Sequence, residues 1–209
     1  MVPLVLDLSG RRVVIFGGGP VGARKASFFS SEADVTVVSR SFGPEFEALQ
    51  VRKVTQDLKG VSDRDLAGIL KGAFLAVAAT DDADLNDRIG KLCQASGIHF
   101  NNATGTPGDV VLPAVSKGVH HAVAITTFGK APGMARFLRE RFEAEYPGLD
   151  PMIELTARLR SALKEQVPDQ AGRQEIIGRM LADREVWDTV NRDGDRAWAL
   201  VEGRYLHGR

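Results

Sequence analysis

The feature that most constrains the fold is a glycine-rich loop between a strand-like and a helix-like segment near the N-terminus. Residues 12–16 form a short apolar run, which predicts a buried strand. Gly17, Gly19 and Gly22 follow with the spacing G-x-G-x-x-G, and residues 20–32 have apolar side chains at helical spacing. Such a loop turns sharply, lets a pyrophosphate approach the backbone and packs the helix close to the strand, so each glycine position excludes a Cβ. The helix N-terminus then offers free N–H groups to phosphates.

Further strand-like and helix-like segments alternate along the first half of the chain. The expected strands are residues 34–39, 73–79 and 97–101, and a short helix is expected at 45–50. A longer helix is expected to be capped by Asp84 and to carry Leu85, Ile89, Leu92 and Cys93 on one face. This order predicts a parallel sheet with right-handed crossovers, and hence an α/β, Rossmann-type dinucleotide-binding domain over residues 1–112. The alternative is a tight glycine turn in an unrelated α/β fold.

The pattern changes after about residue 108. Strands are expected at 109–113 and 119–127, and helix from Gly133, where Met134, Phe137, Leu138 and Phe142 form one apolar stripe. Pro147 and Gly148 interrupt this helix, and residues 150–206 form a charged helical tail with stops near Pro168 and Gly194. We therefore expect a small mixed segment over residues 113–147 and a C-terminal helical domain over residues 148–209.

Composition excludes several classes of protein. Lys+Arg and Asp+Glu both total 27, so no overall field attracts nucleic acid or an anionic membrane. Cys93 is the single cysteine, which excludes a disulfide framework and favours a reducing cytoplasm. No apolar stretch approaches the roughly 20 residues of a membrane span, so we expect a soluble intracellular protein.

Ligands of such folds bind at the carboxyl ends of the strands, next to the glycine loop. The predicted cofactor-binding residues are therefore Gly17, Gly19, Pro20, Val21, Gly22, Ser39, Arg40, Ser41, Thr80 and Asp81. No acidic residue ends the second strand to hold a ribose hydroxyl. Arg40 could instead meet a 2′-phosphate or be a solvated loop arginine, so NAD is expected and NADP stays open. Asp82 or Asp84 could simply cap the next helix.

Several segments together resemble a known family. They are residues 17–26 (GGGPVGARKA), residues 78–82 (AATDD) with Asn86, residues 111–114 (VLPA), residues 125–132 (ITTFGKAP), and then Ala135-Arg136 and Leu138-Arg139-Glu140. In this order they resemble the precorrin-2 dehydrogenase / sirohydrochlorin ferrochelatase family, the N-terminal module of siroheme synthases. The resemblance covers residues 3 to about 145.

The resemblance implies NAD-dependent oxidation of precorrin-2 to sirohydrochlorin and, in bifunctional members, iron insertion to give siroheme. It also implies an intertwined homodimer formed through residues 113–147, with the active site between the two domains, and a separate methyltransferase acting upstream. Precorrin-2 carries eight carboxylates, which favours local cations. The predicted substrate-binding residues are Asn101, Lys130, Arg136 and Arg139. The arginines could equally lie on a solvated helix face, paired with Glu140 and Glu143.

The sequence also departs from the family pattern. Thr104 stands where the family has an aspartate that is its candidate general base and metal-handling residue, and a hydroxyl cannot accept protons near neutral pH as a carboxylate can. Asp109 could replace it if the shortened loop re-aims that side chain. In the later segment Phe128 and Ala131 replace a glycine and a serine, while Thr127 keeps a hydroxyl.

The predicted catalytic residues are therefore Thr104, Asp109 and Thr127, with no metal site. We expect a dehydrogenase, and ferrochelatase activity is left open. The alternative is a non-catalytic dinucleotide or tetrapyrrole sensor on the same fold. His120 and His121 lie in a strand pattern, one on each side, and are interpreted as structural.

Overall fold

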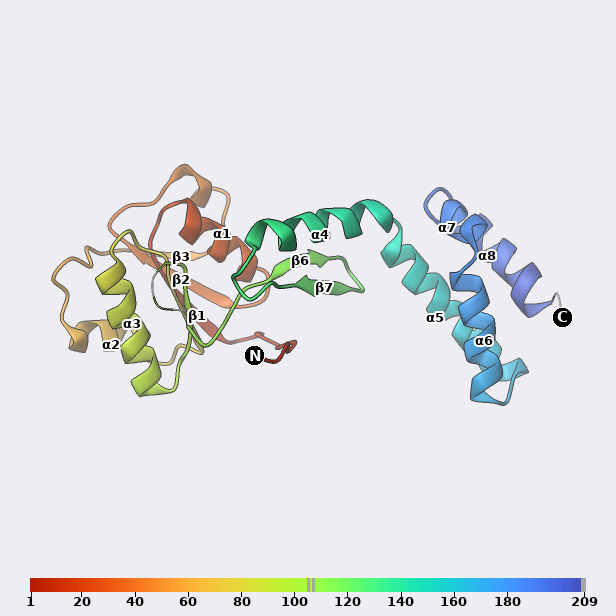
Figure 1. Cartoon of the computed structure of the whole chain (residues 1–209), viewed down its shortest axis with the longest axis horizontal. Coiled ribbons are helices and arrows are strands. Elements are labelled where there is room, and N and C mark those ends of the chain that lie inside the picture. The colour runs from red at the N-terminus through yellow and green to blue at the C-terminus, as the bar shows by residue number, and fades with distance from the viewer. Residues whose placement is uncertain (105, 107, 208–209) are drawn as a thin grey trace. The chain divides into compact units, whose positions relative to one another are not determined.

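A computed structural model describes residues 1–104, 106 and 108–207 of the chain (Figure 1). The chain forms two compact units, Met1–Leu112 and Pro113–Arg209. The first unit has the range expected for the dinucleotide-binding domain. The further boundary expected near residue 147 falls inside the second unit and stays a prediction.

The first unit is built on a five-stranded parallel sheet with the strand order β3-β2-β1-β4-β5. The strands are β1 (Arg12–Phe16), β2 (Asp34–Ser39), β3 (Arg52–Thr55), β4 (Leu75–Ala78) and β5 (His99–Asn102). The helices are α1 (Pro20–Phe29), α2 (Asp63–Leu70) and α3 (Ala83–Ser96), with a 3₁₀ turn, η1, at Pro44–Phe46. The sheet order reverses between β1 and β4, the position at which such folds bind ligands. The predicted Rossmann-type sheet is confirmed.

Alternate side chains of the sheet build two separate cores. Val13 and Ile15 of β1 pack on the face that α1 covers, whereas Val14 and Phe16 pack on the face that α2 and α3 cover. Strands that are buried on both faces read as continuous apolar runs, which is why β1, β2 and β4 were visible in the sequence. Cys93 of α3 points into the core, as expected, and burial raises the pKa of its thiol to about 12.

Five features of the first unit differ from what the sequence predicted. The strand β3 and the helix α2 were missed, because β3 is an exposed edge strand and α2 is only eight residues long. The helix expected at 45–50 is only η1. The helix α1 ends at Phe29 rather than at residue 32, because the C-cap residue Ser30 turns its hydroxyl back to the Ser27 carbonyl. Asp82, not Asp84, caps α3, with its carboxylate accepting the N–H of Leu85.

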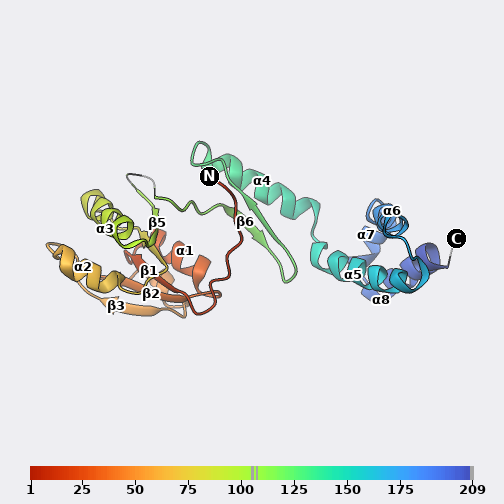
Figure 2. The same cartoon turned by 90° about the horizontal axis from the view of Figure 1, so that it is seen from below.

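The second unit begins with an antiparallel hairpin and continues entirely as helices (Figure 2). The hairpin strands are β6 (Ala114–Lys117) and β7 (Ala122–Ile125), and α4 (Pro132–Glu145) packs along both of them. The remaining helices are α5 (Leu149–Gln166), α6 (Gln170–Leu181), α7 (Arg184–Val190), α8 (Gly194–Val201) and a final π-type turn, η2 (Glu202–Leu206). Leu159, Leu163, Met180 and Val201 form the fully buried centre of these helices.

One strand prediction for this region was wrong, and another was too long. Residues 109–113 form no strand. The N–H of Val110 donates to the Phe100 carbonyl of β5, but no ladder of backbone hydrogen bonds follows, and Pro113 has no N–H to extend one. The strand expected at 119–127 is only β7. Val119 and His120 lie in the hairpin turn, where the carboxylate of Asp150 accepts both of their backbone N–H groups. Across the described residues, no helix combines the length and the apolar character needed to cross a bilayer.

Candidate active site

The glycine loop has the geometry that a pyrophosphate site requires. Gly17 has φ +115°, and a Cβ there would collide with the carbonyl group of Ala79 at the end of β4. A Cβ at Gly22 would collide with the carbonyl oxygen of Gly17, so this position allows α1 to pack closely on the loop. Gly19 is different, because no atom lies within 4 Å of its hypothetical Cβ. Gly19 is the N-cap residue of α1, and no side chain caps this helix end, so the backbone N–H groups of its first turn are free for an anion.

The loop is one wall of a cleft of about 1090 Å³ at the carboxyl ends of the strands. Nine of the ten predicted cofactor-binding residues line this cleft, and Gly22 is the exception. The predicted residues that line it are Gly17, Gly19, Pro20, Val21, Ser39, Arg40, Ser41, Thr80 and Asp81. Their placement agrees with a dinucleotide site, and their individual roles stay predictions.

The part of the cleft that follows β3 was not predicted from the sequence. Asp57, Leu58 and Lys59 line the cleft just after β3, whose end is paired with the end of β2, and the Asp57 carboxylate accepts the N–H of Lys59 at 2.9 Å. Asp57 therefore supplies a carboxylate near the place where the sequence showed none. Local pattern gave little sign of it, because Arg52 and Lys53 mask the short edge strand that precedes Asp57. Within the described part of the chain, Arg40 has no ion-pair partner and is exposed.

A buried amide connects the ends of β4 and β5. Asn86 of α3 is fully buried; its Oδ1 accepts the Thr80 hydroxyl at 2.6 Å, and its Nδ2 donates to the Thr104 hydroxyl at 2.9 Å. Thr104 therefore lies beside Thr80, which lines the cleft, rather than in an isolated loop. Asn86 was noticed as a motif residue but not as a site residue. Its burial next to two hydroxyls identifies it as the residue that positions both threonines.

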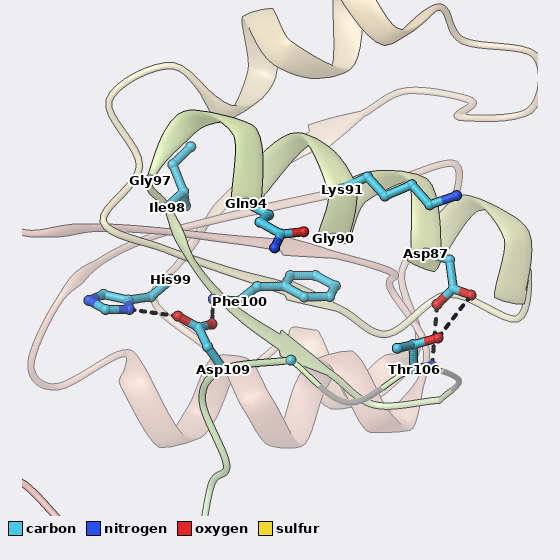
Figure 3. Close-up of a pocket in the computed structure, with 11 residues that line it drawn as sticks. Asp87, Gly90, Lys91, Gln94, Gly97, Ile98, His99, Phe100, Thr106 and Asp109 are labelled. Carbon is cyan, nitrogen blue, oxygen red and sulfur yellow. Dashed lines mark hydrogen bonds and ion pairs between the residues drawn. The ribbon is translucent and has the colours of Figure 1, made fainter. Parts of the chain in front are cut away.

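Asp109 is placed away from the cleft, in a separate pocket of about 440 Å³ against α3 (Figure 3). Its carboxylate accepts the backbone N–H of Phe100 at 2.6 Å and contacts His99 Nδ1 at 3.0 Å. Burial acts to raise the pKa of Asp109, but the hydrogen bonds from His99 and Phe100 outweigh it and hold the pKa below its ordinary value. The geometry favours a role in fixing the segment after β5. Catalysis by Asp109 stays a prediction.

Asn101 is buried on β5, and its Nδ2 donates to the carbonyl of Val110 at 2.7 Å. Its Oδ1 has no hydrogen-bond partner among the described residues. The side chain lines neither of the two pockets above. A role in substrate binding stays a prediction for this residue.

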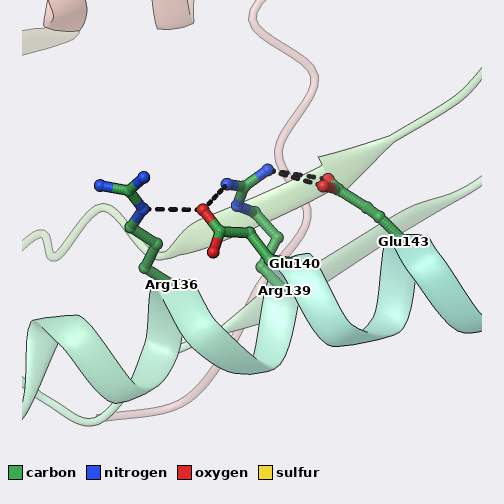
Figure 4. Close-up of polar contacts among 4 residues, drawn as sticks. All are labelled: Arg136, Arg139, Glu140 and Glu143. Carbon is green, nitrogen blue, oxygen red and sulfur yellow. Dashed lines mark hydrogen bonds and ion pairs between the residues drawn. The ribbon is translucent and has the colours of Figure 1, made fainter.

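The remaining predicted site residues lie in the second unit, at the start of α4. Thr127 accepts the N–H of Ala131 through its hydroxyl, and Lys130 is exposed two residues before α4 begins. Arg136 pairs with Glu140 through Nε at 2.7 Å, and Arg139 pairs with Glu143 at 2.8 Å (Figure 4). The pairing considered from the sequence is therefore observed. The terminal nitrogens of Arg136 point away from Glu140 in Figure 4, so only one edge of this guanidinium is used.

The two histidines lie in the turn between β6 and β7, and not on opposite sides of a strand. His121 Nδ1 contacts Asp150 at 2.7 Å and His120 Nε2 contacts Glu154 at 2.8 Å. These contacts tie the hairpin turn to α5. No group of three or more His, Cys, Asp or Glu side chains has metal-binding geometry within the described residues.

A Rossmann-type parallel sheet with an open glycine loop at its switch point defines a class of dinucleotide-binding protein. Comparison with known proteins agrees, since residues 4–114 match a family described as "Putative NAD(P)-binding". The chain is 39% identical to a Precorrin-2 dehydrogenase of Methanosarcina barkeri, over 96% of this chain and 93% of the relative. It belongs to the precorrin-2 dehydrogenase family.

The chain is also similar to a longer protein and to a solved structure. It is 34% identical to a Siroheme synthase of Azotobacter vinelandii over 88% of its own length, but it spans only 40% of that longer protein. A solved structure titled "SirC, precorrin-2 dehydrogenase" superimposes with a TM-score of 0.68 at 22% identity, over 97% of this chain and the whole of that one. This likeness supports the fold.

Proposed function

We propose that this chain oxidises precorrin-2 to sirohydrochlorin in siroheme biosynthesis, with NAD⁺ as the oxidant. In the balanced reaction precorrin-2 loses one hydride to NAD⁺ and one proton to solvent, giving sirohydrochlorin, NADH and H⁺. The observation that supports it most directly is the open space at Gly19 in a chain of this family. A binding protein without catalysis is not favoured, because the nearly full-length relative is named as a dehydrogenase.

The glycine loop and the start of α1 fit a nicotinamide dinucleotide. The free N–H groups of the first turn and the absence of a Cβ at Gly19 would hold the pyrophosphate. Asp57 and Arg40 line the far part of the cleft, where the adenosine ribose would lie in this fold. When bound, the nicotinamide supplies hydride acceptance, and the chain's own task is to align the substrate with it.

The site offers hydroxyl and amide groups where the family pattern has a carboxylate. Thr104 is held by Asn86, and Asn86 is held by Thr80, so the hydroxyls are fixed in place. A fixed hydroxyl can orient a water molecule or a substrate group, but it does not remove a proton near neutral pH. We therefore assign the ring proton to solvent and propose a dehydrogenase without ferrochelatase activity.

We assign the binding of the substrate carboxylates to Arg136 and Lys130, which are both exposed. The guanidinium of Arg136 is 75% exposed on its side chain and keeps its terminal nitrogens free of Glu140. A planar guanidinium can bind a carboxylate with two parallel hydrogen bonds. Arg139 is largely covered and doubly paired, so it would act mainly by orienting Glu140 and Glu143.

The second unit also supports a homodimer. The hairpin has only two strands, so both of its outer edges lack a strand partner within the described residues. Met134, Phe137 and Leu138 of α4 are exposed apolar side chains beside it. Open strand edges and an exposed apolar helix face are typical of a surface that a second copy covers. A separate methyltransferase would supply precorrin-2, and the cytoplasmic location stays a prediction.

The proposal is tested by an anaerobic assay of the purified protein with precorrin-2 and NAD⁺, following NADH absorbance and the macrocycle spectrum together. We expect equal amounts of NADH and sirohydrochlorin, and no acceleration of the next step by ferrous or cobaltous ion. Gly19→Val is the matched inactive control, because it fills the pyrophosphate space without an internal clash. Binding of NAD⁺ and precorrin-2 without turnover would instead establish a sensor.

A further inference from the structure

The loop between β7 and α4 holds an aromatic residue in a backbone conformation that suits glycine. Phe128 has φ +51°, and it is the one non-glycine residue with a positive φ in the described part of the chain. The left-handed region brings the Cβ of an L-residue close to the following carbonyl, and bulky residues rarely adopt it. Glycine would occupy this position without strain.

Hydrogen bonds on both sides of Phe128 fix this conformation. The Thr126 hydroxyl accepts the N–H of Phe128 at 3.0 Å, and the Thr127 hydroxyl accepts the N–H of Ala131 at 3.1 Å. The Thr127 carbonyl also accepts the N–H of Lys130 at 3.0 Å. The turn therefore cannot relax at Phe128 without losing at least one of these bonds.

The side chain of Phe128 is largely uncovered in the fold. The ring of Phe128 is 60% exposed, and it makes no aromatic pair among the described residues. Strain of this kind persists where the surrounding structure fixes it, as the three hydrogen bonds do here, and it concentrates at ligand sites. Lys130 is exposed two residues further on, so the same turn presents a flat apolar surface and a cation.

We propose that Phe128 is a specificity-determining residue that packs its ring on a flat face of the tetrapyrrole, while Lys130 binds one of the peripheral carboxylates. This inference rests on the proposed function, because it takes the polycarboxylate macrocycle as the ligand. An aromatic side chain packs against another π-face in an offset or edge-to-face arrangement, and the pyrrole rings of the macrocycle offer such faces. Phe128 therefore contributes to the choice of substrate and not to the hydride step.

The decisive variant is Phe128→Gly, because it removes the ring and relieves the backbone strain at the same position. We expect a melting temperature equal to or above that of the wild type, a KM for precorrin-2 raised about tenfold, and an unchanged KM for NAD⁺. The kcat should stay within about twofold, because the ring binds and does not react. Phe28→Ala is the matched control, since Phe28 is an exposed ring on α1 that does not line the cleft.

A second variant gives a measurement that does not depend on turnover. Phe128→Trp should keep its affinity for the substrate. The fluorescence that this tryptophan adds to that of Trp187 and Trp198 should be quenched as sirohydrochlorin is added. A Phe128→Gly protein with wild-type KM and wild-type sirohydrochlorin affinity would overturn the inference. So would a shift in the monomer–dimer equilibrium without a change in KM, which would assign Phe128 to self-association. Failure of the wild type itself to oxidise precorrin-2 would instead overturn the proposed function.

Discussion

The dinucleotide-binding unit and the hairpin with α4 differ in how far they bury their apolar side chains. In the first unit, Val13, Ile15 and Phe16 of β1 are completely buried between the helices on the two faces of the sheet. In α4, Phe137 is 58% exposed, and Met134 and Leu138 are exposed beside it. One region closes its own core, whereas the other leaves an apolar surface exposed, which the proposed homodimer would cover. The residues that form a site in the first region can therefore be identified in a single chain. A site in the second region also depends on the partner that would cover the apolar surface.

The largest expected effect is on NAD⁺ affinity, and it distinguishes Gly19 from Gly22 in the same loop. Gly19→Val should lower NAD⁺ affinity on the order of 100-fold or more, because the side chain fills the space that the pyrophosphate would occupy. Its melting temperature should change little, since no atom lies within 4 Å of the new Cβ. Isothermal titration with NAD⁺ and a thermal melt check both points.

Gly22→Val is the contrasting variant, because its Cβ would collide with the Gly17 carbonyl and separate α1 from the loop. It should destabilise the first unit itself. Equal melting temperatures for the two variants would contradict the distinction drawn between an open and a packed glycine.

A core truncation in the C-terminal helices tests whether the two units are independent. Leu159→Ala removes a fully buried side chain of α5, and it should cost about 2–5 kcal/mol of unfolding free energy. NAD⁺ affinity should be unchanged if the first unit folds by itself. Leu181→Ala, at an exposed position of α6, is the control that should leave stability nearly unchanged. Loss of NAD⁺ binding in Leu159→Ala would show that the units are coupled.

The same contrast explains what the sequence could and could not predict. The strands β1, β2 and β4 are buried on both faces, so their continuous apolar runs identified them, and the glycine spacing identified the loop. The edge strand β3 carries Arg52 and Lys53, which hid it, and the Asp57 wall of the cleft was missed with it. Contacts across large sequence separations, such as Asn86 with Thr104 or His121 with Asp150, could not be derived from local pattern.

The exposed surface of α4 gives a smaller, concentration-dependent effect. Phe137→Asp places a charge in the apolar face and should weaken the proposed homodimer by about 2 kcal/mol, roughly a 30-fold rise in the dimer dissociation constant. The fold of the monomer should survive, because this position is already open to solvent. Analytical ultracentrifugation over a dilution series measures the equilibrium, with Leu181→Asp as the control. A monomeric wild type would remove the dimer from the comparison altogether.

The smallest expected effect concerns the contact that joins the hairpin turn to α5. Hydrogen bonds from His121 and from the backbone N–H groups of Val119 and His120 lower the pKa of Asp150 to about 2, and Glu154 contacts His120 one turn further along α5. A carboxyl group with a lowered pKa in the folded state stabilises the fold above its unfolded pKa of about 3.9. This contribution is lost as the pH falls toward 2.

The Asp150→Asn variant should therefore be less stable than the wild type at neutral pH, and the difference should shrink between about pH 4 and pH 2. Denaturant unfolding monitored by the fluorescence of Trp187 and Trp198, both in the second unit, measures this directly. Glu154→Gln is the matched control, because it alters the neighbouring carboxylate without touching the backbone N–H groups of the turn. A stability difference that stayed constant over this pH range would show that Asp150 acts through geometry alone. In that case the charge of Asp150 would not stabilise the turn, and its hydrogen-bond geometry alone would do so. The two regions would then differ only in how far their apolar side chains are buried.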